Sequence, residues 1–270
     1  MKSKLPSKLN KMVDLVLFAG QSNMSGRGSA AEALMCDGNA GFEYKSVSNP
    51  QELVPIMEPF GLGEDREGAL TDLDSKGKSK RTGSMVSALV DEYYKRSGHQ
   101  IVAVSASKGG TATPKWKSDY AADAAQRLKD AWQFLEGNGI SVERCFVVWC
   151  QGESDGDARR TTEEYMQNTK DIFEVFKAAG AEKCFLVQIG HYNYIDNPQE
   201  RNGLTGAEWD ACYEVIRKAQ VELCKKDDRF SLVASFEPFI NEMKDCFHYK
   251  QGAYNEVGRT AGAKIAEELT

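Results

Sequence analysis

The chain has 270 residues, of which 41% are hydrophobic, and this is enough to bury the core of one large α/β domain. Its formal net charge of −6 argues against nucleic acid or an anionic membrane surface as a partner. No apolar run reaches the roughly 18 residues that a membrane-spanning helix needs, so we expect no membrane association.

The start of the chain predicts no export signal. Residues 1–11 are basic, but the apolar stretch that follows is broken by Asp14 and runs directly into a motif at Gly20. A cleaved signal peptide would have to include this motif, so we expect a cytoplasmic protein. No Cys-x-x-Cys pair occurs, and several cysteines lie within apolar runs, which predicts reduced, buried thiols at Cys36, Cys145, Cys150, Cys184, Cys212, Cys224 and Cys246.

Short apolar runs alternate with helical periodicity along the chain. The runs are rich in Val, Ile, Leu and Phe and lack clean alternation, which is typical of parallel strands covered on both faces. We predict strands at residues 13–19, 101–106, 145–150, 184–189 and 230–234, and helices at 84–96, 119–135, 161–179, 207–225 and 253–269. This order predicts a three-layer α/β/α sandwich with a five-stranded parallel sheet, whose functional residues follow the strand ends.

Residues 25–81 do not fit the alternation. They are rich in Gly, Pro and charge without a period, and a structureless loop of this length is unusual inside a compact domain. We interpret them as a folded-back active-site insertion with room for short strands or turns. Within it, residues 72–81 predict an exposed, mobile loop. With no internal repeat, residues 1–270 form one domain.

Two glycine-containing motifs follow the first two predicted strands. In Gly20-Gln21-Ser22-Asn23-Met24, a serine after a strand end can expose its hydroxyl, although an isolated serine here is more often a helix cap. The pair Gly109 and Gly110 lets a backbone N–H approach a ligand closely, although for the pair by itself an ordinary tight turn is the better explanation.

Two polar clusters follow later elements. Gln151, Glu153 and Asp155 come directly after the third strand. Gln151 can offer an amide donor and the two carboxylates can orient neighbouring groups, or the cluster can form an acceptor-rich helix N-terminus. Near the C-terminus, Asp245 precedes His248 by three residues, a spacing that lets the carboxylate accept the Nδ1–H and fix the tautomer of a base. A nucleophile, a base, an acid and oxyanion donors together meet the demands of acyl transfer.

In this order, the four clusters resemble the SGNH hydrolase superfamily. The version here is similar to its sialate O-acetylesterase branch, which includes the acetylxylan esterases of carbohydrate esterase family 6. The resemblance spans nearly the whole chain. It implies a flavodoxin-like parallel sheet and removal of acetyl groups from O-acetylated carbohydrate through an acyl-enzyme, without a metal or organic cofactor.

Carried over residue by residue, the resemblance implies that Ser22 is the nucleophile, His248 the base and Asp245 its partner. Elsewhere in the superfamily, an asparagine in the cluster after the third strand donates to the oxyanion. Here the residue after Gly152 is Glu153, so the resemblance favours Gln151 as this donor. The full set of implied oxyanion donors is the N–H groups of Ser22 and Gly109 and the side chain of Gln151, with Gly110 and Glu153 in supporting roles. We further expect substrate contacts from Gln21, Asn23, His191 and Trp116, with Trp209 also suited to stacking on a sugar.

Two other functions stay open at this point. A lipase or thioesterase could use the same residues on a longer acyl chain, although the polar insertion offers no apolar lid. A catalytically silent sugar-binding protein is the second, although the complete set of Ser22, His248 and Asp245 argues against it. Without an export signal, we favour short acetylated sugars over a polymer as the substrate. The sequence does not determine the sugar or the oligomeric state.

Overall fold

A parallel sheet forms the centre of the molecule. The computed structural model describes residues 5–66 and 69–270. In these residues seven strands lie in the order β3-β2-β4-β1-β5-β6-β7. Their bounds are β1 Met12–Gly20, β2 Gly41–Tyr44, β3 Leu53–Pro55, β4 Ile101–Ser107, β5 Ser141–Cys150, β6 Lys183–Gln188 and β7 Phe230–Ser235.

Five of these strands are the predicted ones. Their spatial order, β4-β1-β5-β6-β7, is the 2-1-3-4-5 order of a flavodoxin-like sheet, and all their pairings are parallel. In the centre of the sheet, Gly20 at the end of β1 pairs with Ser107 of β4 and with Cys150 of β5. Three strands therefore end at the same level, and the segments that follow them meet at one edge.

The expectation of five strands was incomplete, because the insertion adds two more. β2 pairs parallel with β4, and β3 pairs antiparallel with β2. All four residues of β2 are buried, including Glu43. Strands of three and four residues are too short to show a period, which is why the sequence predicted only a folded-back segment here.

The five predicted long helices are confirmed within a few residues. The helices are α1 Ser22–Ser25, α2 Val86–Ser97, α3 Thr113–Lys115, α4 Ala121–Gly137, α5 Glu153–Asp157, α6 Thr162–Lys177, α7 Gly206–Lys226 and α8 Gln251–Leu269, with short turns η1 Ala30–Glu32, η2 Trp116–Tyr120 and η3 Glu237–Glu242. Thr161 starts α6 with a reciprocal cap, since its hydroxyl accepts the Glu164 N–H while the Glu164 carboxylate accepts the Thr161 N–H.

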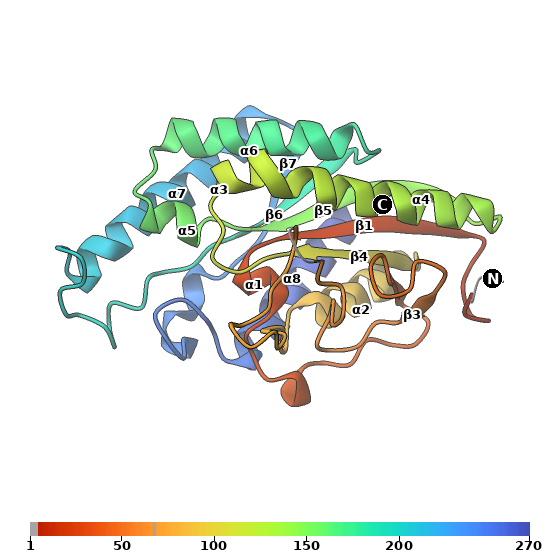
Figure 1. Cartoon of the computed structure of the whole chain (residues 1–270), viewed down its shortest axis with the longest axis horizontal. Helices are drawn as coiled ribbons and strands as arrows, with labels where there is room; N and C mark the ends of the chain where they lie inside the picture. The colour runs from red at the N-terminus through yellow and green to blue at the C-terminus, as the bar shows by residue number, and fades with distance from the viewer. Residues whose placement is uncertain (1–4, 67–68) are drawn as a thin grey trace.

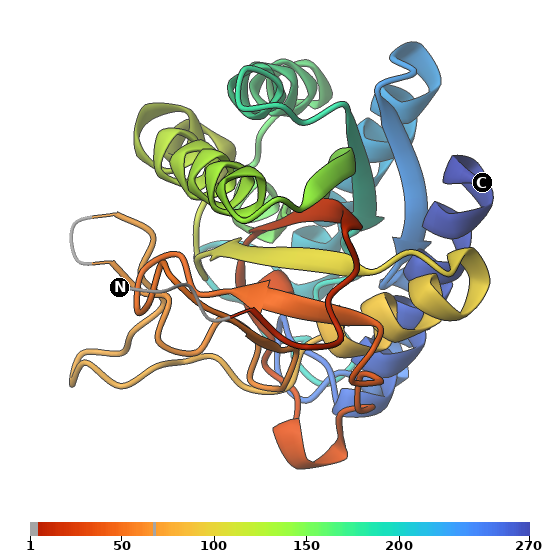
Figure 2. The same ribbon diagram turned by 90° about the vertical axis from the view of Figure 1, so that its right-hand side faces the viewer.

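The helices cover the sheet on both faces, as Figures 1 and 2 show. α4, α6 and α7 enclose one half of the hydrophobic core, and α2 and α8 enclose the other. α8 approaches α2 closely because of Gly258 and Gly262. A Cβ at these positions would lie 2.4 Å from Met85 O and 2.3 Å from Leu89 O, so alanine would push the two helices apart.

The sequence predicts an exposed, mobile loop at residues 72–81, but the structure buries both ends of this stretch. Its two ends, Asp72 and Arg81, are each only 2% exposed, because both side chains turn inward to hydrogen-bond with the end of β4 and the segment after it. All seven cysteines lie in the described part of the chain and each is free. The prediction of buried thiols is confirmed for Cys145, Cys150 and Cys184 and is wrong for the other four, which are only partly buried. Among the described residues, none of the helices is both long and apolar enough to span a bilayer.

Candidate active site

Ser22 lies at a sharp turn from β1 into the one-turn helix α1. The turn depends on Gly20, which has φ +144°, and a Cβ there would lie 2.0 Å from Cys150 O of the neighbouring strand. The next amide, Gln21 N–H, donates to that same carbonyl over 2.9 Å. Only glycine permits this backbone path, which lifts Ser22 above the carboxyl ends of the strands.

A chain of hydrogen bonds joins Ser22, His248 and Asp245. His248 Nε2 lies 3.0 Å from Ser22 Oγ, and His248 Nδ1 lies 2.9 Å from Asp245 Oδ2. A carboxylate only accepts, so Nδ1 carries the proton and Nε2 is left to accept from the serine hydroxyl. The structure thus brings together the three residues that the sequence analysis singled out, with the tautomer that a base requires.

The local backbone holds Asp245 in its ionised form. Its other oxygen, Oδ1, accepts the amides of Phe247 (2.8 Å) and His248 (2.9 Å). Burial alone would raise the pKa of Asp245, but the hydrogen bonds from His248 and from these amides lower it to about 2. A tight turn between residues 245 and 248 therefore builds the carboxylate–imidazole pair locally.

Ser22 and His248 open into a small polar cavity of about 280 Å³. Phe247 is the one large apolar side chain among the residues around it. The lining consists of Gln21, Ser22, Arg27, Lys80, Gly109, Gly110, Glu153, Ser154, Asp157, Phe247 and His248. Such a volume has room for an acyl group of a few atoms and one sugar-sized group.

The two glycines of the second motif differ in what their amides do. Gly109 N–H donates to Asp72 Oδ1 over 3.1 Å, so this amide is occupied. Gly110, which has φ +69°, donates its N–H to none of the described residues. The predicted donor Gly109 is thus engaged by the protein itself, and Gly110 is the glycine with a free N–H at the cavity.

The predicted role of Gln151 as an oxyanion donor does not agree with its surroundings. The side chain is fully buried, and its Nε2 donates to Asp155 Oδ2 over 2.6 Å and to Thr111 O over 3.0 Å. Both amide hydrogens are therefore engaged beneath the cavity. Gln151 is not among the cavity-lining residues, whereas Gln21, the predicted contact beside Ser22, is.

Asn23 is a structural connector and not a substrate contact. It is 1% exposed and accepts the Tyr254 hydroxyl at 2.6 Å. Its Nδ2 donates to Glu153 Oε1 over 2.5 Å and to Phe247 O over 3.1 Å. Asn23 thereby joins α1, α5, α8 and the loop that carries His248. Burial raises the pKa of Glu153, and the bond from Asn23 and the nearby His248 only partly offset this effect.

The aromatic residues expected to stack on a sugar are in the core. Trp116 is fully buried, donates its indole N–H to Thr111 Oγ1 over 3.0 Å, and packs edge-on against Trp149. Trp209 is 6% exposed and donates to Arg201 O. His191 is half-buried, 2.8 Å from Asp210 Oδ2, and does not line the cavity with Ser22. Helical amphipathicity alone did not distinguish these buried rings from exposed ones.

With this geometry in view, comparison with known families is informative. Residues 12–267 match the family described as carbohydrate esterase, sialic acid-specific acetylesterase. The chain belongs to this carbohydrate esterase family. A search of curated protein sequences returns no match to this chain.

Solved structures share the fold of this chain at low sequence identity. A protein from Arabidopsis thaliana aligns with a TM-score of 0.66 at 16% identity, over 94% of this chain and 98% of the other. NanS aligns with a TM-score of 0.54 at 10% identity, over 96% and 98%. A carbohydrate acetylesterase from Xanthomonas citri aligns with a TM-score of 0.53 at 14% identity, over 94% of this chain and 56% of the other.

Several residues around the cavity were not predicted from the sequence. Ser154 and Asp157 belong to α5; Ser154 lies within the cluster of Gln151, Glu153 and Asp155, and Asp157 follows it by two residues, so proximity to that cluster could have indicated both. Arg27 and Lys80 lie at opposite ends of the insertion, where no pattern distinguishes a cavity wall from solvent-exposed polar chain. Asp72 was placed in the loop, although its side chain contacts Gly109.

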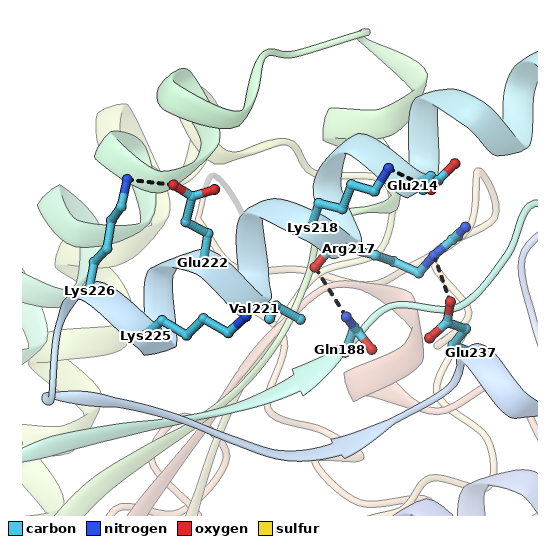
Figure 3. A pocket seen from close by; sticks show the side chains of 9 residues that line it. All are labelled: Gln188, Glu214, Arg217, Lys218, Val221, Glu222, Lys225, Lys226 and Glu237. Atoms are coloured by element: carbon cyan, nitrogen blue, oxygen red, sulfur yellow. Dashed lines mark hydrogen bonds and ion pairs between the residues drawn. The ribbon is translucent and has the colours of Figure 1, made fainter.

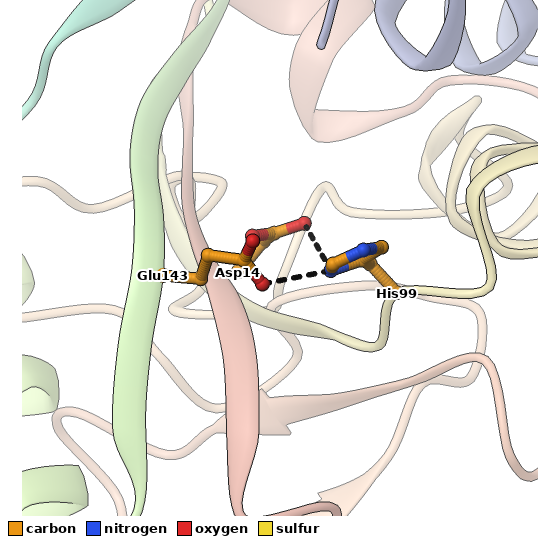
Figure 4. A group of neighbouring side chains, drawn as sticks. All are labelled: Asp14, His99 and Glu143. Carbon is orange, nitrogen blue, oxygen red and sulfur yellow. Dashed lines mark ion pairs between the residues drawn. The ribbon is translucent and has the colours of Figure 1, made fainter. Parts of the chain in front are cut away.

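Two other features lie apart from Ser22. A surface groove of about 590 Å³ beside α7 contains Arg217, Lys218 and Glu237 (Figure 3). Arg217 there pairs with Glu237, and Lys218 pairs with Glu214. Near the amino end of β1, donor atoms of Asp14, His99 and Glu143 lie within 4.8 Å of one another (Figure 4). Asp14 Oδ2 there already contacts Arg144 at 3.5 Å and accepts the Tyr93 hydroxyl at 2.5 Å, so a cation is not needed to balance it.

Proposed function

We propose that the protein is a serine esterase that removes O-acetyl groups from acetylated sugars, with Ser22 as nucleophile, His248 as base and Asp245 as its partner. The continuous hydrogen-bond path from Asp245 Oδ2 through the imidazole to Ser22 Oγ, with distances of 2.9 Å and 3.0 Å, carries this proposal. Membership of a carbohydrate esterase family supports the choice of substrate class.

In the first half of the reaction, Ser22 Oγ attacks the acetyl carbonyl carbon while His248 Nε2 takes the hydroxyl proton. The carbonyl π electrons move to oxygen, and the N–H groups of Ser22 and Gly110 stabilise the oxyanion. As the first N–H of a helix, Ser22 N has no intrahelical acceptor. Collapse of the intermediate breaks the ester C–O bond, and His248 gives its proton to the sugar oxygen.

In the second half, water replaces the sugar. His248 takes a proton from the water, whose oxygen attacks the acetyl–Ser22 carbonyl. The second tetrahedral intermediate expels the serine oxygen, which recovers its proton from His248, and acetate leaves. Throughout, Asp245 stays ionised and stabilises the imidazolium, in keeping with its low pKa.

The cavity favours acetyl over longer acyl groups. Its volume is about 280 Å³, and apart from Phe247 its lining offers polar side chains and glycine backbone. An octanoyl chain packs best against several large apolar side chains, and this lining offers one. A lipase or thioesterase function is therefore disfavoured, and the aligned His248 and Ser22 argue against a silent sugar-binding protein.

The charge of the cavity walls bears on the kind of sugar. Arg27 and Lys80 contribute cations from the insertion, and Glu153 and Asp157 lie on α5. We propose that an acidic sugar such as an O-acetylated sialate places its carboxylate toward Arg27 and Lys80. A neutral xylo-oligosaccharide is the alternative substrate. A cytoplasmic location stays a prediction, and short sugars are the substrates that it favours.

Acetate release tests the proposal directly. The panel contains acetylated sialic acid, acetylated xylo-oligosaccharides, acetylated monosaccharides, and aryl acetate and aryl octanoate esters. We expect acetate but not octanoate esters to be hydrolysed, and Ser22→Ala to abolish release. Full activity of Ser22→Ala would overturn the nucleophile assignment. A strong preference for octanoate would overturn the sugar assignment.

A further inference from the structure

Asp72 belongs to the insertion, and its carboxylate contacts the turn of residues 108–111 beside Ser22, which we call the glycine turn. Its Oδ1 accepts the Gly109 N–H at 3.1 Å. Arg27 Nη2 reaches both of its oxygens, at 3.0 Å and 2.8 Å. Arg27 and Gly109 both line the cavity, so the Arg27–Asp72 ion pair is directly adjacent to the proposed reaction site.

Asp72 is held firmly in this place. Its own N–H donates to Asp65 Oδ1 over 2.7 Å, and its carbonyl oxygen accepts the Lys80 N–H at 2.8 Å. Burial would raise its pKa, but Arg27, Arg81 and the Gly109 amide hold that pKa below its usual value. The side chain is thus an ionised acceptor with a fixed position, unlike a loop tip that swings aside when substrate enters.

The glycine turn is fixed on its other sides as well. Lys108 N–H donates to Gly20 O over 3.0 Å, and Thr111 Oγ1 donates to Lys108 O over 2.7 Å. A Cβ on Gly109 would lie 2.6 Å from Arg27 Nη2 and 3.3 Å from Ser22 Cβ, so this residue is enclosed between the ion pair and the serine. With the Gly109 N–H taken by Asp72, Gly110 N–H is the amide of a cavity-lining glycine that none of the described residues accepts.

We propose that Asp72, oriented by Arg27, is a positioning residue for the oxyanion hole: it fixes the Gly109 peptide so that Gly110 N–H can donate to the developing oxyanion. This inference rests on the proposed esterase function. It gives the insertion a part in catalysis, because the acceptor that sets the turn comes from residues outside the α/β core. Asp72 acts on the reaction only through the turn and does not touch the substrate.

Two substitutions of Asp72 and one control test the inference with an aryl acetate. Asp72→Ala removes the acceptor, and we expect kcat to fall about 10²-fold with KM unchanged, since misplacing a donor affects the transition state more than the bound ester. Asp72→Asn keeps an oxygen for Gly109 N–H, and we expect it to recover most of that loss. Asp74→Ala is the matched control, because the Asp74 carboxylate accepts only the loop amides of Lys76 and Lys78.

A boronic acid that forms a tetrahedral adduct on Ser22 supplies a second readout. If Asp72 positions the donors, the affinity of the boronic acid for the Asp72→Ala variant falls by about the same factor as kcat/KM, because such adducts resemble the transition state. Urea midpoints show whether each variant is folded. Should Asp72→Ala fail to fold, Arg27→Lys carries the test: we expect it to lower kcat for the aryl acetate with KM retained, while Asp72→Asn keeps kcat close to that of the wild type.

The inference is overturned if Asp72→Ala keeps kcat within twofold, if only KM changes, or if kcat rises, since a rise would mean that the carboxylate blocks the turn. Ser22→Ala in the same assay separates the two proposals. An active wild type with an inactive Ser22→Ala and an unaffected Asp72→Ala refutes only the role of Asp72. An inactive wild type, or an active Ser22→Ala, refutes the esterase proposal itself.

Discussion

Replacing Asn23 with alanine distinguishes a structural connector from a substrate contact. The side chain joins three buried groups: the Glu153 carboxylate, the Phe247 carbonyl and the Tyr254 hydroxyl. Asn23→Ala leaves each of them without this partner in a site that is 1% exposed. We therefore expect a large loss of stability, whereas loss of a substrate contact would raise KM and leave stability unchanged.

The magnitude follows from the number of stranded groups. A buried polar group that loses its partner costs about 1–3 kcal/mol, so three such groups predict a loss of about 3–9 kcal/mol in the free energy of unfolding. Domains of this kind have about 5–15 kcal/mol in total, so the variant should lose a large part of its stability and unfold at much lower urea concentration. Urea unfolding of wild type and variant measures the difference, and a loss below about 1 kcal/mol would refute the reasoning.

Asn23→Asp sharpens the same test through pH. The new carboxylate would face Glu153 Oε1 across the 2.5 Å that the amide now spans, and two carboxylates so close cannot both be ionised. The pKa of Glu153 is already raised by burial. The destabilisation relative to wild type should therefore be larger at pH 8 than at pH 5, where one proton can be shared; a deficit that does not change with pH would contradict this geometry.

Three further predictions follow from the site. Gln151→Ala should lower the urea midpoint, because it leaves Thr111 O without its donor and removes one of the two donors to Asp155 Oδ2, which keeps the Thr113 N–H. It should reduce kcat on an aryl acetate by less than about tenfold; a loss of 10²–10³-fold with normal stability would restore Gln151 as an oxyanion donor. Trp116→Ala should cost about 3–5 kcal/mol of unfolding free energy, measured by urea titration, and leave KM for acetylated sugars unchanged in the protein that remains folded. Because the pKa of Asp245 is lowered to about 2, its contribution to stability is present above the unfolded value near 4 and disappears as the pH falls through 2, so the gap between the urea midpoints of wild type and Asp245→Asn should shrink over that interval; a gap that grows toward acid would contradict the sign.

The parts of the site that the sequence could predict share one physical basis. Parallel strands of an α/β sheet end at a common edge, so residues after β1 and β4 had to meet, as the pairing of Gly20 with Ser107 confirms. The Asp245–His248 pair was predictable for a local reason, because a spacing of three residues lets a turn bring the two side chains together. Neither inference needed the direction of a side chain in the folded core.

Where the direction of a side chain mattered, the sequence was insufficient. Gln151 and Ser154 both follow β5, yet Gln151 turns below the strand ends toward Asp155 while Ser154 lines the cavity. Asn23 is adjacent to the reactive serine, yet it turns into the protein toward Tyr254. Placement after a strand predicts which edge a residue lies at. Which side chains face the ligand depends on packing from distant elements, and periodicity contains no information on that.

The insertion shows the same limit on a larger scale. It begins just after α1, where Ser25 Oγ donates to Ser107 Oγ over 3.0 Å, and it ends at Arg81, whose Nη1 and Nη2 donate to Ser107 Oγ and Ser107 O over 2.8 Å each. Both ends are thus bonded to the last residue of β4, immediately before the glycine turn, while Asp72 binds the turn itself. The polarity of the insertion and its lack of periodicity predict only a segment that folds over an active site formed entirely by the α/β core. These bonds instead connect the segment to the strand end and turn that present the proposed oxyanion donor, so exchanging or shortening the insertion should alter kcat as well as substrate choice.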